Sequence, residues 1–474
     1  MIANLNPYPA MKDSGVPWLG KVPEHWSTRR LCALARNPIK NGVGESAQAF
    51  REDWPRYIRI TDIAGPRRLR EKTRASLPPE IAADAPLEPG DLLLAAVGAT
   101  YGKSYLHRGH TTPACFAGYL VRVAPNQDVM PEFLSYWTEC AYYWDQVNSQ
   151  VIQSTIQNFS AARVKGLRVP LSPLPEQAAI VRYLDYMDRR IRKYIRAKQK
   201  LIQLLEEQKQ AIIHHAVTRG LDPNVRLKPS GVEWLGDVPE HWAVLRSKYV
   251  FREVDNRSAT GEETHLSMSQ KLGLIPSSQI EERRLVSESY AGAKLCERGY
   301  LVLNRLKAHL GVFALAPERG LVSPDYTVFR PARPMEPRYF ESVYRTPACR
   351  LELRQRAKGI VQGFWRLYTD AFYDIRVPVP PAAEQITIMA ALGGEIATTN
   401  SAIARTKSEI ALMQEYRTRL IADVVTGKLD VREAAAQLPD ETDEPEPLDE
   451  TDALSDAEEN KAGDLDAVTE GAEA

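Results

Sequence analysis

The sequence contains one long stretch twice, and this duplication limits the folds that the chain can adopt. Residues 169–222 begin VPLSPLPEQAAI and end AVTRGLD, whereas residues 377–430 begin VPVPPAAEQITI and end VVTGKLD. The two copies align without a gap at an offset of 208 residues. Prolines stand only at the start of each copy, where a helix tolerates them, so each copy is predicted to form one long helix.

The apolar residues of each copy recur at steps of three, four and seven, which places them on one helical face close to a heptad pattern. A helix of roughly 60 Å, at 1.5 Å per residue, cannot bury that face against itself. We therefore expect the two copies to pair as antiparallel, coiled-coil-like helices, with two separate surface helices as the alternative. Asp188, Lys198 and Lys209 interrupt the apolar face. The predicted helix-pair interface is Ile195, Ile202, Leu205, Ile212, Ile403, Ile410, Met413 and Leu420.

A second repeat precedes each module. Residues 12–26 read KDSGVPWLGKVPEHW and residues 228–242 read KPSGVEWLGDVPEHW, so that twelve of fifteen positions match at an offset of 216. The Gly, Pro and Trp content predicts a compact segment whose tryptophans act as packing anchors. His25 and His241 each stand alone beside a tryptophan, and we interpret them as structural residues rather than ligands.

The two repeats divide the chain into alternating modules and helices. Each module shows strand-like runs followed by a helical stretch, in the same order and with little identity between the modules. The runs are 57–63, 91–98, 119–125 and the helix near 132–144, then 299–306, 311–317, 326–331 and the helix near 338–346. The predicted domains are an N-terminal extension 1–11, module 12–170, helix 171–222, module 223–378, helix 379–430 and tail 431–474. This order indicates an α+β fold made by duplication.

The formal charge of the chain is zero, but the charges are unevenly distributed. Residues 440–474 hold fifteen Asp or Glu and one Lys, which leaves 60 basic and 46 acidic residues, a formal charge of +14, in the rest. A basic body suits a polyanion such as DNA, although many basic proteins bind none. The acidic tail is poor in aromatic residues, so we expect it to be disordered; competition with DNA for the basic body is a second interpretation.

Several protein classes are disfavoured. No apolar run is long enough to span a bilayer, and the first residues lack the pattern of a signal peptide. The five scattered cysteines form no CxxC pair, which fits the cytoplasm and argues against a zinc site or a disulfide framework. Neither a GxxxxGK[ST] phosphate loop nor an N/D-P-P-Y/F methyltransferase motif occurs. We therefore expect a cytoplasmic, non-catalytic chain without a metal site.

The motifs carry a resemblance to a known family. The paired KxSGVxWLGxVPEHW segments, the paired VPxxPxxEQ helix entries and the order of modules and helices resemble the specificity subunit of type I restriction-modification systems. Local matches are YIRITDI and GATYGK in the first half, and LSMSQKLGLI, GYLVLNRLKAHLG, LVSPDYTVFRP and AKGIVQGFWRLY in the second. The resemblance covers residues 8–430 and leaves the acidic tail outside.

This resemblance implies two mixed α/β target recognition domains separated by two long antiparallel helices, related by a pseudo-two-fold internal repeat. Each domain would read one half of a bipartite, asymmetric site in double-stranded DNA. The helices would set the spacing and dock two methyltransferase subunits, and restriction and translocase subunits would complete the complex. The chain itself would bind no cofactor, because S-adenosylmethionine, ATP and magnesium would belong to the partner subunits.

Polar loops near the strand ends are the candidate DNA contacts. Base edges are read mainly by Arg, Lys, Asn and Gln, whereas phosphates accept hydrogen bonds from basic side chains, hydroxyls and backbone amides. The loops GATYGK, STIQN, NRLKAH and KGIVQGFWR supply most of these groups. The predicted DNA-binding residues are Arg59, Thr100, Tyr101, Lys103, Gln157, Asn158, Lys271, Arg305, Lys307, Lys358, Gln362 and Arg366. For each of them an ordinary surface role is the alternative.

Two other functions remain open from the sequence. The long helices are also compatible with a coiled-coil scaffold that assembles proteins without reading DNA. A stand-alone endonuclease is a third possibility, but no cluster of acidic residues with lysine supports it.

Overall fold

The computed structural model describes residues 5–109, 112–150, 159–269, 272–279, 290–306, 311–359 and 366–439. The chain divides into two compact units, one made of residues up to Lys198 together with those from Ser408 on, the other of Gln199–Lys407. Both long helices pass from one unit into the other. Each unit is described here by itself.

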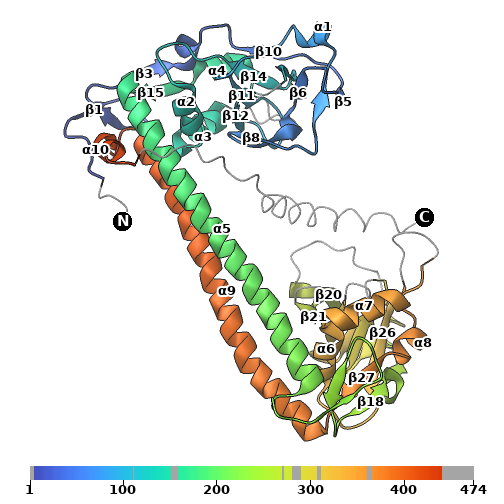
Figure 1. Ribbon diagram of the computed structural model, residues 1–474. Coiled ribbons are helices and arrows are strands. Elements are labelled where there is room, and N and C mark those ends of the chain that lie inside the picture. Colours follow the sequence, from blue (N-terminus) through green and yellow to red (C-terminus); the bar gives the residue numbers. More distant parts are fainter. Residues whose placement is uncertain are drawn as a thin grey trace. The chain divides into compact units, whose positions relative to one another are not determined.

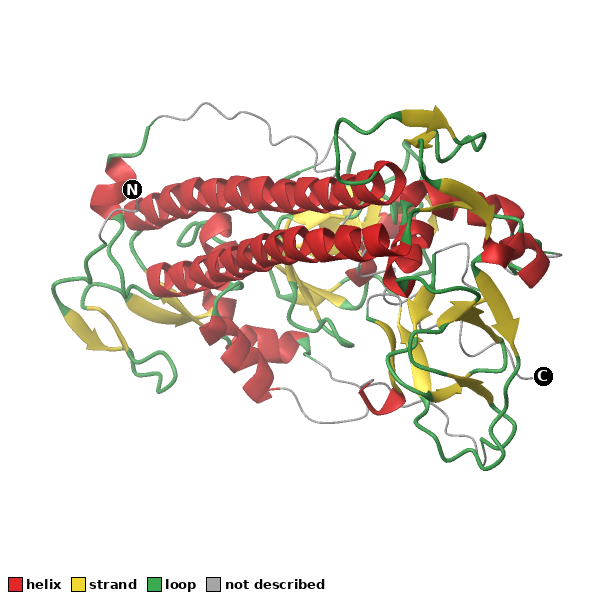
Figure 2. Ribbon diagram, turned by 90° about the horizontal axis from the view of Figure 1, so that it is seen from below, coloured by secondary structure: helices red, strands yellow, loops and turns green. Residues whose placement is uncertain are grey.

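The two predicted long helices are present. Helix α5 spans Leu174–Arg219 and helix α9 spans Ala382–Val425, and Figures 1 and 2 show them as the two longest helices of the chain. Each is followed closely by a glycine in the left-handed region, Gly220 at φ +78° and Gly427 at φ +74°. A glycine there lets the chain leave the helix without a Cβ penalty. The helix ends are therefore set by proline before the first turn and glycine after the last.

The first unit contains two sheets. Strands β12 (Ser104–Leu106), β11 (Leu92–Ala95), β14 (Leu120–Val123) and β4 (Lys40–Asn41) form an antiparallel sheet in this order. A second sheet has the order β10 (Pro86–Leu87), β13 (Ala114–Phe116), β6 (Arg56–Ile58), β9 (Ala75–Ser76) and β5 (Gln48–Ala49). Helices α2 (Pro131–Trp137), α3 (Ala141–Gln150) and α4 (Ala161–Gly166) follow. Strand β15 (Arg168–Leu171) pairs with β3 (Ser27–Arg30) and leads into α5.

The second unit repeats this plan. Strands β24 (Phe313–Leu315), β23 (Leu301–Asn304), β26 (Tyr326–Pro331) and β19 (Phe251–Val254) form the matching sheet. Two pairs stand beside it, β20 (Leu266–Ser269) with β21 (Gly273–Pro276) and β22 (Lys294–Cys296) with β25 (Gly320–Val322). Helices α6 (Pro337–Arg345), α7 (Pro347–Arg356) and α8 (Thr369–Tyr373) follow. Strand β27 (Arg376–Val379) pairs with β18 (Ala243–Arg246) and leads into α9.

The KxSGVxWLGxVPEHW segments form equivalent hairpins. Strands β1 (Met11–Asp13) and β2 (Lys21–Pro23) pair in the first unit, and β16 (Leu227–Pro229) and β17 (Asp237–Pro239) pair in the second. In both hairpins the final tryptophan is buried, Trp26 at 0% exposure and Trp242 at 1%. The prediction of compact segments anchored by tryptophan is confirmed at these two residues.

Two predicted elements are divided in the structure. The run 57–63 is not one strand, because β6 ends at Ile58, a 3-10 turn covers Ile60–Asp62, and β7 (Ile63–Gly65) pairs with β8 (Arg68–Leu69). The helical stretch 132–144 is split into α2 and α3. The break at Thr138, Glu139 and Cys140 contains no proline or glycine, so the sequence gives no strong sign of it.

The beginning of the predicted disordered tail is folded. Helix α10 spans Arg432–Ala436, and Val431 and Ala435 are buried in the core of the first unit at 0% and 2% exposure. The prediction of disorder from residue 431 is therefore wrong for this helix. Short apolar side chains that fill a gap in a core give too weak a pattern to stand out in an acidic sequence. Residues 440–474 lie outside the described residues.

The ends of both long helices belong to the module cores. The core of the first unit includes Ile180 and Leu184 from α5 and Val424 from α9. The core of the second unit includes Val217 from α5 and Leu392 from α9. Each module core is therefore built around the start of one helix and the end of the other.

Candidate nucleic-acid interface and its supports

One of the predicted DNA-contact loops, GATYGK, has described partners in the first unit. The loop that follows β11 lies against the chain that enters α4, where the Phe159 amide donates a 2.7 Å hydrogen bond to the Ala96 carbonyl. The Tyr101 hydroxyl donates to Oδ1 of Asn148 on α3 at 2.8 Å. A Cβ atom on Gly102 would lie 3.0 Å from the ring of Trp144, so glycine is needed for this close approach. The loop is thereby held on α3.

The second unit contains the same junction. The Leu367 amide donates to the Arg305 carbonyl at 3.1 Å, in the position that the Phe159–Ala96 bond occupies in the first unit. A Cβ atom on Gly311 would lie 2.6 Å from Nε of Arg350 on α7. The segments that follow β11 and β23 are therefore paired in the same way with the segments that lead into α4 and α8. Their pairing follows from the repeated topology rather than from residue identity.

The described candidates in the first unit differ in availability. Thr100 and Tyr101 are half-buried, and Tyr101 packs against the core, whereas Lys103 is exposed. Arg59 is engaged within the module, because its guanidinium binds the buried carboxylate of Asp62 at 3.0 Å and the Thr73 carbonyl at 2.5 Å. Arg59 thus holds a turn together, and Lys103 is the exposed cation of its loop.

The described candidates in the second unit show a similar division. Arg305 donates from Nε to the Asp325 carbonyl at 2.8 Å, which fixes its side chain along the strand ends. Lys358 and Arg366 are both exposed, and their backbones exchange two hydrogen bonds of 2.9 and 2.8 Å. This bridge closes the base of the connection between α7 and α8. The remaining candidates lie outside the described residues: Gln157, Asn158, Lys271, Lys307 and Gln362.

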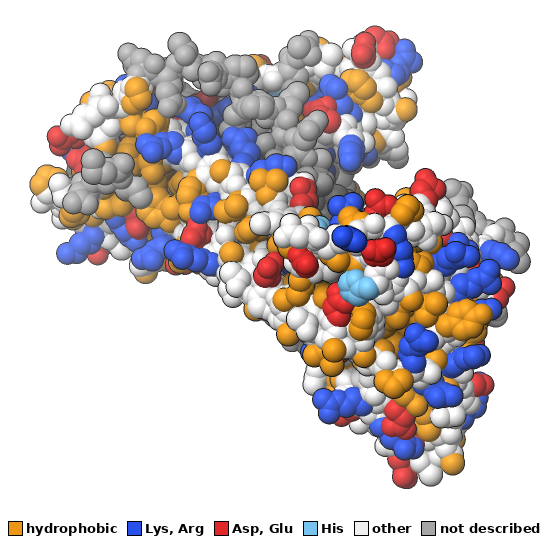
Figure 3. Space-filling model, turned by 60° about the horizontal axis from the view of Figure 1, so that its bottom comes forward, with side chains coloured by type: hydrophobic (Ala, Val, Ile, Leu, Met, Phe, Trp, Pro, Cys, Tyr) orange, Lys and Arg blue, Asp and Glu red, His pale blue; other side chains and the backbone are white. Residues whose placement is uncertain are grey.

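The surface charge is dispersed. Figure 3 shows Lys and Arg side chains scattered over the visible face, interspersed with acidic and apolar side chains. No compact basic block on that face marks a DNA surface by itself. The interface has to be located from individual residues and their partners.

A carboxylate joins each hairpin to a long helix. In the first unit, Oε1 of Glu176 accepts a 2.8 Å hydrogen bond from Nε1 of Trp26, and Oε2 lies 2.8 Å from Nε2 of His25. The Tyr8 hydroxyl also donates to Glu176, and burial together with this bond raises the pKa of Tyr8. The neighbouring Gln177 accepts from the Met130 amide at 2.8 Å. We call this arrangement the first clamp.

The second unit has an equivalent clamp. Glu384 accepts from Nε1 of Trp242 at 3.1 Å and lies 2.8 Å from Nε2 of His241. Gln385 accepts from the Glu336 amide at 2.9 Å. The hairpin motif and the Glu-Gln pair therefore recur together for a physical reason, since the indole and the imidazole of one contact the carboxylate of the other. The structural interpretation of both histidines agrees with this geometry.

Each clamp also contacts the end of the other long helix. A Cβ atom on Gly427 would lie 2.4 Å from Pro23 and 3.2 Å from Trp26. A Cβ atom on Gly220 would lie 3.3 Å from Trp242. Each tryptophan therefore rests between the first turn of one helix and the glycine that follows the other.

The first clamp is expected to contribute more stability than the second. Replacing Glu176 by alanine leaves the buried Trp26 indole and Tyr8 hydroxyl without their acceptor, at a cost of about 2–3 kcal/mol. The Glu384 side chain is 30% exposed, so water can replace it and Glu384→Ala should cost only about 1 kcal/mol. Thermal unfolding of both variants tests this order. Equal losses would contradict it, and Glu176→Gln, which keeps an acceptor oxygen, should restore part of the loss.

The predicted helix-pair residues lie where the pattern placed them. Ile403 and Leu420 are buried at 5% exposure, and the other six are half-buried. The three charged residues on the apolar face have partners. Lys198 pairs with Glu409 at 2.7 Å, Lys209 reaches Asn400 at 3.2 Å, and Asp188 pairs with Arg417. In these three pairs the residue number on α9 falls as the residue number on α5 rises, so the two helices are antiparallel.

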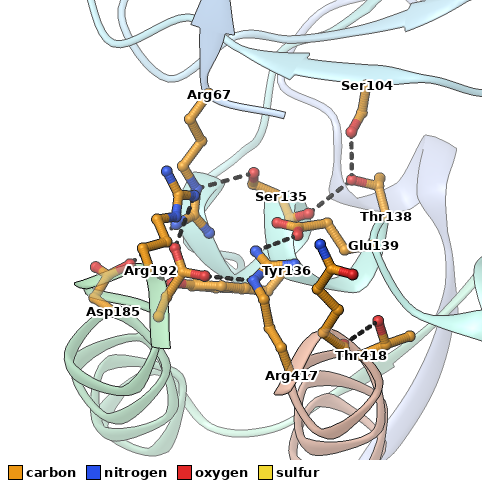
Figure 4. A network of polar contacts seen from close by, with 12 residues as sticks. Arg67, Ser104, Ser135, Tyr136, Thr138, Glu139, Asp185, Arg192, Arg417 and Thr418 are labelled. Carbon is orange, nitrogen blue, oxygen red and sulfur yellow. Dashed lines mark hydrogen bonds and ion pairs between the residues drawn. The ribbon is translucent and has the colours of Figure 1, made fainter. Parts of the chain in front are cut away.

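Arg417 is the centre of a polar network in the first unit, shown in Figure 4. Its guanidinium donates to Asp188 on α5 at 2.5 Å and to Glu139, between α2 and α3, at 2.7 Å. Burial works to raise the pKa of Asp188, but the charges of Arg417 and Arg192 outweigh it and lower this pKa. Arg67 lies over the Tyr136 ring at 3.7 Å and binds Asp185 at 3.0 Å. The network ties both helices to the first module.

Arg417 and Lys209 occupy equivalent positions of the two repeats, and this makes them a matched pair. Arg417→Ala leaves the largely buried Glu139 without this ion pair and Asp188 with Arg192 as its remaining partner, so it should destabilise the first unit by about 3 kcal/mol. Lys209→Ala removes contacts to Asn400 and to the more exposed Glu206, which should cost less than about 1 kcal/mol. Chemical unfolding of the two variants measures the difference. Similar losses would mean that Arg417 is no special support.

The lowered pKa of Asp188 predicts a dependence of stability on pH. A carboxyl group whose pKa is lower in the folded state stabilises the fold above its unfolded pKa, about 3.9, and loses that contribution as pH falls through the folded pKa. The stability difference between the wild type and Asp188→Asn should therefore be full near pH 6 and shrink below about pH 4. Unfolding midpoints across this range provide the measurement. A difference that stays constant would contradict the prediction.

The described residues offer no sign of other chemistry. Within them, no helix is long and apolar enough to cross a membrane, and no group of three or more His, Cys, Asp or Glu could hold a metal ion. Burial raises the pKa of the Cys115 and Cys140 thiols to about 12, so both stay protonated near neutral pH. These two cysteines are therefore packing residues.

Comparisons with known proteins agree with this architecture. Residues 80–204 match the family model described as the type I restriction modification DNA specificity domain. The chain is 20% identical over 433 residues to the type I restriction enzyme EcoKI specificity subunit of Escherichia coli K12, covering 86% of this chain and 90% of that protein. In sequence the chain is thus similar to type I specificity subunits. It is also 21% identical over 222 residues to the StySPI specificity subunit of Salmonella potsdam.

The extent of the similarity varies among these specificity subunits. The match to the Salmonella potsdam protein covers 45% of this chain and 47% of that protein, and the match to the putative MjaX specificity subunit of Methanocaldococcus jannaschii covers 53% of its length. The chain thus spans about half the length of these two relatives. A solved chain from work on complex assembly and conformational transition of the type I R-M system aligns at a TM-score of 0.65 with 16% identity, covering 86% of this chain and 99% of that one. This likeness confirms the predicted fold class.

Proposed function

We propose that this chain is the non-catalytic DNA sequence-specificity subunit of a type I restriction-modification complex. The observation that supports the proposal is the duplicated junction, in which the Phe159–Ala96 and Leu367–Arg305 hydrogen bonds join the segment after one strand to the segment before α4 or α8 in each unit. Each module has one such junction, so the chain has two separate surfaces for reading DNA. Because the side chains at the junctions differ, the two surfaces read different half-sites of an asymmetric sequence.

The long helices provide the ruler between the half-sites. Both helices are continuous from one unit to the other, and their ends are packed into the module cores. A change in helix length therefore moves the modules rather than being absorbed in a flexible linker. Two methyltransferase subunits dock on this framework, and restriction and translocase subunits join them. S-adenosylmethionine, ATP and magnesium are bound by those partners.

Methylation mapping tests the reading function. The full chain is expressed with its methyltransferase partner in a host that lacks other adenine methylation, and modified adenines are mapped by long-read sequencing. Two short, unlike half-sites separated by a fixed gap are expected. An active methyltransferase that modifies no defined sequence would sink the proposal and favour an assembly scaffold.

Lengthening both helices tests the ruler. Seven residues inserted after Gln203 and seven after Ala404 preserve the heptad pattern and extend the pair by about 10 Å, roughly three base pairs at 3.4 Å each. The gap in the methylated motif should grow by about this amount while both half-sites stay the same. Seven residues inserted instead into the exposed turn at Asn224 form the control and should leave the gap unchanged. An unaltered gap in the first variant would refute the ruler.

A further inference from the structure

Helix α7 of the second unit carries two arginines on one face. Arg350 and Arg354 are four residues apart, so their side chains project from neighbouring turns, and both residues are exposed. Other arginines nearby are neutralised, since Arg345 pairs with Glu341 at 3.0 Å and Arg356 with Glu352 at 2.5 Å. In the part of the chain that the structure describes, neither Arg350 nor Arg354 has a carboxylate partner.

Arg350 lies directly against the candidate DNA loop that follows β23. A Cβ atom built on Gly311 would approach its Nε, Cδ and Cγ atoms at 2.6, 2.9 and 3.0 Å. The Arg350 side chain thus lies against Gly311, between strands β23 and β24 in the sequence. Burial and the nearby charge of Arg345 both lower the pKa of Arg350. A bound anion would relieve this unfavourable concentration of positive charge.

The equivalent face in the first unit is neutral. Trp144 and Asn148 occupy the positions on α3 that correspond to Arg350 and Arg354 on α7. They support their loop by packing on Gly102 and by accepting the Tyr101 hydroxyl. Loop support therefore does not require positive charge at these two positions. The arginines of the second unit need another explanation.

We propose that Arg350 and Arg354 form a phosphate-binding ridge that contacts neighbouring backbone phosphates of DNA at the second half-site. This inference rests on the proposed DNA-reading function and adds residues that the sequence motifs did not indicate. Guanidinium groups bind phosphate through charge-assisted, often bidentate, hydrogen bonds. Phosphate contacts fix the register of the protein on the duplex without reading its sequence. The ridge thus positions the loop after β23 over the base edges.

The dependence of DNA binding on salt tests the ridge. The full chain is titrated with a random-sequence duplex at several salt concentrations, and log K is plotted against log salt. Arg350→Ala and Arg354→Ala should each weaken binding and reduce the magnitude of the slope by about 0.9, the contribution of one phosphate contact. Arg350→Lys, which keeps the charge, should retain the slope. Gly311→Ala, which displaces the Arg350 side chain, should weaken binding as Arg350→Ala does.

The control is Arg252→Ala, which removes an exposed arginine from β19. This strand and β24 are the two edge strands of the sheet that contains β23. Arg252→Ala should leave the slope unchanged, and all the arginine variants should keep the unfolding midpoint of the wild type within a few degrees. Gly311→Ala should lower the midpoint, since alanine is strained at φ +73°. If Arg350→Ala and Arg354→Ala match this control, the ridge is refuted. Failure of the proposed function is a separate result, namely wild-type chain that binds duplex DNA but yields no defined methylation motif with an active partner.

Discussion

The rest of the architecture depends on the hydrogen bonds that the carboxylate at the start of each long helix makes. Glu176 and Glu384 each accept the indole N–H of a buried tryptophan and lie beside a histidine. The tryptophan also packs on the glycine that follows the other long helix. One cluster of side chains thus fixes a hairpin, the start of one helix and the end of the other. The cluster occurs twice, once in each unit, so both modules are joined to the long helices in the same way.

Both units have this clamp, but they differ in the further polar contacts around it. The first unit adds Tyr8 to the clamp and places Arg417 between Asp188 and Glu139. The second unit has Lys209 at the position of Arg417, where it reaches only an amide across the helix pair. Its clamp carboxylate is also more exposed. The duplicated fold is therefore retained by the clamps, whereas the additional buried charge is confined to the unit that holds both chain ends of the described structure.

The sequence predicted the parts of the fold that depend on periodicity and repetition. Helix α5 and helix α9 follow from proline at the start, glycine at the end and apolar residues recurring along one face, and strand β26 has the limits that the sequence predicts. The division of 132–144 into two helices could not be predicted, because the break at Thr138, Glu139 and Cys140 contains no proline or glycine to mark it. Helix α10 was missed since its buried residues, Val431 and Ala435, are small and adjoin a strongly acidic stretch.

The motifs indicated the candidate loops, but they did not indicate the role of each residue in them. The four loops were found from their polar and glycine content, and the segments after β11 and β23 are joined to the segments before α4 and α8. The engagement of Arg59 by Asp62 could not be read from the sequence, because it depends on a turn that periodicity represented as a strand. The sequence also did not indicate Arg350. It lies on a helix whose existence the sequence pattern did not reveal, and only the approach to Gly311 connects it to a loop.

The central claim is that each module, held by its clamp, reads its own half-site independently. The most direct measurement replaces residues 243–379 by a copy of residues 27–171, so that equivalent strands β3 and β15 enter and leave the second clamp in place of β18 and β27. Methylation mapping of this double-first-module chain should reveal a symmetric site made of two inverted copies of one half-site. Persistence of the second, unlike half-site would contradict the account.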